Sequence, residues 1–132
     1  LGDVYKRQEL NAFYEVFIKE KQVGFEAVKA EYEALAKANE NSWRILFSIA
    51  NVFSYNEYFK EAIQMWQKTF DCMPKPRYTD SFEAMAQCCV RMGDHESAVE
   101  YYKKELELLR EDWGLKYGAE VDALEEKIRA LQ

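Results

Sequence analysis

Apolar residues along the chain recur mainly at spacings of three and four, which is the period of an amphipathic helix. One such series runs from Glu9 to Gln22, and a second runs from Phe25 to Ala38. Val23 and Gly24 stand between the two series and form the predicted turn. The pattern therefore predicts an N-terminal pair of antiparallel helices.

The same period continues in two further segments, Trp43–Tyr55 and Glu57–Cys72. Ser42 is the predicted N-cap of the first segment, because a serine hydroxyl accepts a hydrogen bond from an early backbone N–H. The turn between the segments lacks glycine, so we expect Asn56 to take the left-handed conformation there. These residues form a second predicted helix pair.

A third pair is predicted over Thr79–Met92 and Asp94–Glu111, and the first residue of each segment is its predicted N-cap. Gly93, between the two segments, tolerates the positive φ with which many helices end. The preceding segment, Met73–Arg77, contains two prolines and is predicted to be non-helical.

Gly114 and Gly118 interrupt the pattern after the third pair, and the chain ends in one more amphipathic series. The apolar residues of this last series are Val121, Leu124, Ile128 and Leu131. We interpret residues 118–132 as a terminal helix that caps a helical stack. The sequence thus predicts an all-α chain of seven helices without strands.

Two of the helix pairs resemble consecutive tetratricopeptide repeats. In the first, the matching residues are Leu46, Ile49, Ala50, Phe53, Ala62, Trp66 and Pro74. In the second, they are Phe82, Met85, Ala86, Cys89, Gly93, Ala98 and Tyr102. The resemblance implies a short right-handed stack of antiparallel helix pairs in one domain, 9–132. Within it, 9–38 is a degenerate pair, 43–74 and 79–113 are repeats, and 118–132 is the cap.

In proteins with such repeats, the first helix of each repeat lines a concave groove, so the resemblance implies a partner-binding surface. Its predicted residues are Arg44, Phe47, Asn51, Tyr55, Glu83, Gln87 and Arg91. Mixed aromatic and polar side chains suit an extended peptide or a partner helix. The alternative is that these residues form only the solvated inner side of a stack. Phe47 and Ala84 replace the Lys and Asn of family members that bind acidic chaperone tails, so that specific function is not expected.

A second resemblance covers the end of the chain and points to the helical domains of bacterial transcriptional activators. It rests on the run from Leu108 to Leu115, on Gly118 to Val121 and on Leu124. It implies an alternative function, a signal-receiving or oligomerising domain of a regulator whose DNA-binding module lies outside these residues. A structural spacer within a longer repeat protein is a third hypothesis.

The composition of the chain argues against some classes of function. The chain has 132 residues, of which 48% are hydrophobic and 15% aromatic, which indicates one folded domain. A net charge of −6 argues against a nucleic-acid surface, which requires a basic face. The most apolar stretch, Ile45–Phe53, is too short to cross a membrane. We therefore expect a protein or peptide partner, with neither direct nucleic-acid binding nor membrane insertion.

No catalytic, cofactor-binding or metal-binding constellation is predicted. Cys72, Cys88 and Cys89 lack metal-ligand spacing, and we expect them to be buried, reduced thiols, which favours a cytoplasmic location. His95 is the only histidine and stands at a turn, where a surface or capping role is expected. The remaining acidic residues alternate with lysines, as on a solvated helix face.

The first residues have two interpretations, an adapter-derived segment and a natural, polar helix start. Asp3–Gln8 reads as the translation of an adapter used to prepare sequencing libraries, so we expect residues 1–8 to be non-native. The chain would then be a fragment of a longer bacterial protein. A truncated stack leaves an apolar end uncovered, and a homo-oligomer through the N-terminal helix pair is a further hypothesis.

Overall fold

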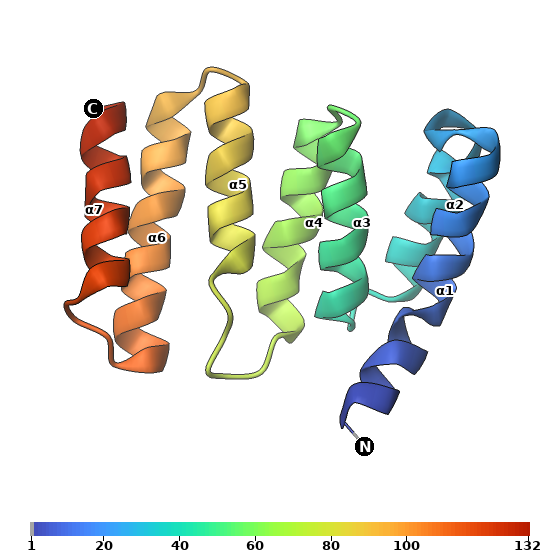
Figure 1. Ribbon diagram of the computed structural model, residues 1–132, viewed down its shortest axis with the longest axis horizontal. Coiled ribbons are helices and arrows are strands. Elements are labelled where there is room, and N and C mark those ends of the chain that lie inside the picture. The colour runs from blue at the N-terminus through green and yellow to red at the C-terminus, as the bar shows by residue number, and fades with distance from the viewer. Residues whose placement is uncertain (1) are drawn as a thin grey trace. The chain divides into compact units, whose positions relative to one another are not determined.

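The computed structural model describes residues 2–132, with side chains from Gln8 onward. This part of the chain contains seven helices and no strand, as predicted (Figure 1). The helices form two compact units, one that ends at Cys72 and one that begins at Met73. In both units, helices that are adjacent in sequence pack against one another. The all-α class of the chain is therefore confirmed.

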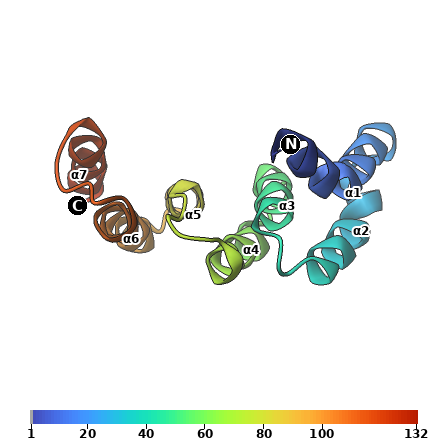
Figure 2. The same cartoon turned by 90° about the horizontal axis from the view of Figure 1, so that it is seen from below.

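The first unit contains two helix pairs. The helices are α1 (Gly2–Val23), α2 (Phe25–Ala38), α3 (Trp43–Tyr55) and α4 (Phe59–Cys72). Besides its own partner α4, α3 contacts both α1 and α2. Within this unit, α1 and α3 lie on one side and α2 and α4 on the other (Figure 2). The two first helices are therefore neighbours on one face.

Aromatic rings fill the core of the first unit. The rings of Phe25 and Phe53 meet edge to face at 5.3 Å, and Tyr32 lies within 6.1 Å of Phe25. Trp66 of α4 is also buried, as are the small Ala50 of α3 and Ala62 of α4. Small residues let the backbones of α3 and α4 approach, while the rings fill the space between neighbouring helices.

The helix ends of the first unit follow most of the sequence signals. The Ser42 hydroxyl accepts a hydrogen bond from the backbone N–H of Ile45, which confirms the predicted N-cap. The prediction for Asn56 is wrong: its φ is −91°, and the positive φ, 68°, belongs to Glu57. Both the backbone N–H and the side-chain amide of Asn56 donate to the Val52 carbonyl, which keeps Asn56 near helical geometry. The chain therefore reverses one residue later, and α4 begins at Phe59.

The second unit contains three helices, α5 (Asp80–Arg91), α6 (His95–Trp113) and α7 (Ala119–Leu131). Its core is mainly aliphatic. The buried cluster consists of Ala86, Val99, Tyr102, Leu106, Leu109, Val121, Leu124 and Ile128. Helix α7 buries its apolar stripe in this cluster, as the sequence pattern predicts.

Most local predictions in the second unit hold, among them the positive φ of Gly93, which is 79°. The Asp94 carboxylate accepts a hydrogen bond from the Ser97 N–H and caps α6. Gly114 ends α6 with a left-handed φ of 64°. Thr79 precedes α5, but its backbone is already helical (φ −87°, ψ −9°) and its side chain makes no capping hydrogen bond. A threonine hydroxyl reaches the early N–H groups only from an extended backbone, so Thr79 is not a working cap.

The structure describes the expected non-native segment, residues 1–8, only in part. The backbone of residues 2–8 is the start of α1, whereas Leu1 and the side chains before Gln8 lie outside the described residues. The origin of residues 1–8 stays a prediction.

Candidate functional site

A hollow of about 260 Å³ opens between α1 and α3, the first helices of the two N-terminal pairs. It brings together two residues of the predicted groove, Asn51 and Tyr55, with side chains of α1. The lining residues are Phe17, Glu20, Lys21, Asn51, Val52 and Tyr55. A concave, mainly apolar surface with a few polar groups is the usual form of a binding site.

The polar groups of this hollow are partly fixed in place. Glu20 accepts a hydrogen bond of 2.6 Å from the Tyr32 hydroxyl. Burial and this carboxylate together raise the pKa of Tyr32, so its hydroxyl stays protonated and keeps donating. The Lys21 ammonium lies 4.6 Å from the centre of the Phe17 ring. Asn51 is exposed, and Tyr55 is 84% exposed, so both present their polar atoms to solvent.

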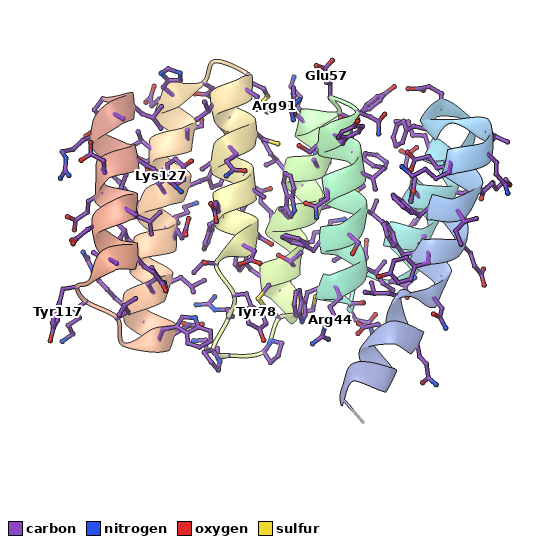
Figure 3. The ribbon with its side chains drawn as sticks, in the orientation of Figure 1. Arg44, Glu57, Tyr78, Arg91, Tyr117 and Lys127 are labelled. Carbon is purple, nitrogen blue, oxygen red and sulfur yellow. The ribbon has the colours of Figure 1, made fainter. Side chains whose placement is uncertain are left out.

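Arg44 and Phe47, also predicted for the groove, have other contacts. An Arg44 guanidinium nitrogen lies 3.2 Å from a Glu9 carboxylate oxygen, and the guanidinium lies 4.6 Å from the Trp43 ring centre. Arg44, which Figure 3 labels at the start of α3, thus ties this helix to α1. Phe47 is half-buried, with its ring 6.4 Å from that of Trp66. Neither residue lines the α1–α3 hollow.

The remaining predicted groove residues, Glu83, Gln87 and Arg91, belong to α5 and hence to the second unit. The Gln87 amide donates to the Glu83 carboxylate at 3.4 Å. Lys127 of α7 reaches the same carboxylate at 3.4 Å. Arg91 is exposed at the end of α5 (Figure 3). Glu83 and Gln87 thus form one polar cluster with α7.

The sequence reasoning missed a buried carboxyl group beside this cluster. Glu105 of α6 is 6% exposed, and among the described residues its Oε1 atom has no hydrogen-bond partner. The pKa of Glu105 is raised to about 7, mainly by burial; nearby Glu83 contributes to this rise, whereas Lys127 opposes it. The sequence contains a signal for the burial of Glu105. This residue stands three positions after the buried Tyr102 and four before the buried Leu109, which is the spacing of one helix face.

A second missed feature fixes the segment before α5 to the end of α6. The Arg77 guanidinium forms a two-point ion pair with Asp112, at 2.8 and 3.0 Å, and its backbone N–H donates to the same carboxylate. These donors lower the pKa of Asp112 to about 2, so the carboxylate is ionised at neutral pH. The Trp113 indole N–H donates to the Arg77 carbonyl at 2.7 Å.

The expected burial of the thiols is confirmed for Cys88 and Cys89 but not for Cys72. Cys88 and Cys89 are buried and Cys72 is half-buried, all as free thiols. Burial raises the pKa of Cys89 to about 11, which keeps it a thiol at neutral pH. His95 is exposed. Over the described residues, no group of three or more His, Cys, Asp or Glu side chains is placed to hold a metal ion.

Two further findings bear on the class of protein. No helix in the described part of the chain has the length and apolar character needed to cross a bilayer. In comparisons with known proteins, no family model matches the chain, and no curated protein is recognisably similar to it.

Proposed function

We propose that the chain is a non-catalytic protein-interaction module of the tetratricopeptide-repeat kind. It holds an extended peptide or a partner helix on the face formed by its first helices. The observation that carries this proposal is the hollow between α1 and α3, where exposed Asn51 and Tyr55 face side chains of α1. Two consecutive first helices therefore share one concave surface.

The chemistry of the hollow suits a polypeptide. An asparagine amide both donates and accepts hydrogen bonds, so Asn51 matches a peptide group in either orientation. Tyr55 supplies a large contact area and a hydroxyl at a low cost in side-chain entropy. Glu20 and Lys21 add one charge of each sign, so a ligand of low net charge fits this hollow best.

The proposal includes a bacterial, cytoplasmic setting, in which the three thiols stay reduced, and a partner that is a protein and not a nucleic acid. The excess of acidic residues, which gives a net charge of −6, supports the second point.

The alternative function is a signal-receiving or oligomerising domain of a bacterial transcriptional regulator with its DNA-binding module elsewhere. One observation favours it: α6 ends at Gly114 and α7 starts after Gly118, which is the helix-break-helix pattern of the C-terminal resemblance. The same pattern also suits the capping helix of a repeat stack.

A peptide-display selection against the whole chain tests the proposed function. Selected peptides are titrated against the wild type and the double variant Asn51→Ala/Tyr55→Ala by fluorescence polarisation. We expect about a tenfold loss of affinity, because two exposed contact residues are removed. Tyr117→Ala is the matched control, since Tyr117 is 83% exposed, belongs to the second unit and does not line the α1–α3 hollow.

Equal affinity of the double variant and the wild type would refute the α1–α3 hollow as the binding surface. Sedimentation velocity of the free chain addresses oligomerisation separately. A dimer that dissociates when the exposed Ile18 is changed to Glu would favour the oligomerising alternative.

A further inference from the structure

A second hollow, of about 390 Å³, lies entirely within the second unit. It is bounded by the start of α5, the end of α6 and the start of α7. Its apolar walls come from Tyr78, Leu109, Trp113 and Leu115, and its carboxylates come from Asp80 and Glu120. Aromatic, aliphatic and acidic groups thus converge on one cavity.

The aromatic walls are held in position by contacts outside the hollow. The rings of Tyr78 and Trp113 lie 6.3 Å apart, tilted by 40°, and are 46% and 47% exposed. The Trp113 indole donates to the Arg77 carbonyl, and Arg77 is itself fixed to Asp112 by the two-point ion pair. The ring faces are therefore arranged before any ligand binds, which reduces the entropy lost on binding.

Two carboxylates, those of Asp80 and Glu120, line this hollow. The ion pairs of the second unit use the carboxylates of Asp112, Glu83 and Glu126. Among the described residues, Asp80 and Glu120 take part in none of them. Both lie close enough to the buried Glu105 to disfavour its ionisation, as Glu83 does, whereas Lys127 favours it. A bound cation would relieve this repulsion.

These groups suit one class of ligand. The face of an aromatic ring attracts a cation, most strongly where water is excluded. Carboxylates form charge-assisted hydrogen bonds with ammonium and guanidinium groups. Leu109 and Leu115 offer apolar surface to the methylene stem that carries such a group. An anion would be repelled, and a neutral apolar side chain would desolvate the carboxylates without compensation.

We propose that this hollow binds a lysine or arginine side chain of a partner polypeptide. The site is separate from the α1–α3 hollow and does not depend on it, so it goes beyond the function proposed above. It assigns a basic residue to the partner and gives roles to Tyr78, Trp113, Asp80 and Glu120.

The test uses the full chain and three capped pentapeptides, Gly-Ser-X-Ser-Gly, where X is lysine, arginine or norleucine. Binding is followed through the indole N–H resonance of Trp113, which is assigned with a Trp113→Phe variant. We expect saturable shifts with the lysine and arginine peptides and at least about fivefold weaker binding of the norleucine peptide. Added salt should weaken the first two selectively.

Variants locate the binding. Asp80→Asn/Glu120→Gln should weaken the lysine peptide by about fivefold or more, since both carboxylates are neutralised. Glu111→Gln, an exposed change on α6 outside the hollow, is the matched control and should have no effect. Asn51→Ala/Tyr55→Ala should also have no effect, which separates this site from the α1–α3 hollow. Far-UV circular dichroism confirms that each variant is folded.

Three results would overturn the proposal. Equal affinity for the norleucine peptide would show a purely apolar surface. Undiminished binding by Asp80→Asn/Glu120→Gln would remove the carboxylates from the site. The absence of any shift of the Trp113 indole up to about 10 mM peptide would exclude binding of useful strength.

Discussion

The two units bury their side chains in different ways. In the first unit, the rings of Phe13, Phe25, Tyr32 and Phe53 pack against one another across three helices. In the second unit, leucine, valine and isoleucine side chains make up most of the core. Aromatic rings span wide gaps with few residues, so the first unit closes a core even though its N-terminal pair departs from the repeat signature.

The units also differ in the kind of buried side-chain polar atom that lacks a hydrogen-bond partner. Among the described residues, a buried atom without a hydrogen-bond partner occurs once in each unit, at Trp66 Nε1 and at Glu105 Oε1. The indole N–H is neutral at every accessible pH. The carboxyl group can ionise, and its ionisation in a buried position costs free energy. A change in pH therefore acts on the second unit through the buried Glu105, whereas the described residues of the first unit include no buried carboxyl group.

The largest effect should come from removing a central ring. Phe53 is fully buried among Phe25, Tyr32 and Tyr58, so Phe53→Ala should lower the free energy of unfolding of the first unit by about 4 kcal/mol. Leu124→Ala, in the core of the second unit, removes fewer atoms and should cost that unit about 3 kcal/mol. Hydrogen exchange, measured by mass spectrometry on peptides from each unit, gives both values.

The comparison of the two cores predicts that Phe53→Ala lowers the free energy of unfolding more than Leu124→Ala does. A larger loss for Leu124→Ala than for Phe53→Ala would mean that the ring cluster is loosely packed and contributes less than its burial indicates.

The next largest effect concerns pH. The pKa of Glu105 is raised from an ordinary value of 4.5 to about 7 in the folded state, so this state holds the proton more tightly than the unfolded chain. Because Glu105 ionises over this range, the free energy of unfolding of the second unit should fall as the pH rises from about 4.5 to about 7. Above about pH 7 it should stay low. Glu105→Gln removes the ionisation and should stabilise the unit at about pH 8 by an amount on the order of 2 kcal/mol. Urea unfolding at about pH 5 and pH 8 measures the difference.

Glu107→Gln is the matched control, because Glu107 is exposed on the same helix and its replacement should change stability little at either pH. If Glu105→Gln and the wild type lost stability equally between the two pH values, Glu105 would not be the group responsible.

The smallest predicted effect compares two residues that precede helices. Ser42 caps α3 through the Ile45 N–H and also donates a hydrogen bond to Glu9, so Ser42→Ala should cost about 1 kcal/mol or slightly more. Thr79 makes no capping hydrogen bond to α5, so Thr79→Ala should cost less than about 0.5 kcal/mol. Urea midpoints of the two variants test the comparison, which would fail if the two costs were the same.

Features that depend on neighbouring residues in the sequence could be predicted well. The apolar stripes identified all seven helices of the described chain, and Ser42, Asp94 and Gly114 marked helix ends correctly. The prediction for Asn56 failed because its own hydrogen bonds to Val52 moved the left-handed position to Glu57. Competing local bonds of this kind are not visible in residue preferences.

Features that join distant residues could not be predicted in the same way. Asn51 and Tyr55 were identified on α3, but their neighbours Phe17 and Lys21 come from a helix pair whose signature is degenerate. Arg77 and Asp112 are 35 positions apart, and no periodicity links a proline-rich segment to a helix end. Glu105 was assigned to solvent with the other acidic residues, although its spacing from Tyr102 and Leu109 marked a buried face.

The connections between helices differ in how much change in length they permit during evolution. Gly24 alone separates α1 from α2, at a φ of 90°, so an inserted codon there would shift one helix against the other. Pro74, Lys75 and Pro76 stand outside every helix and are exposed, and a proline has no backbone N–H to lose. A gene could therefore gain codons, or even an entire domain, at this site while each hydrophobic core stays intact.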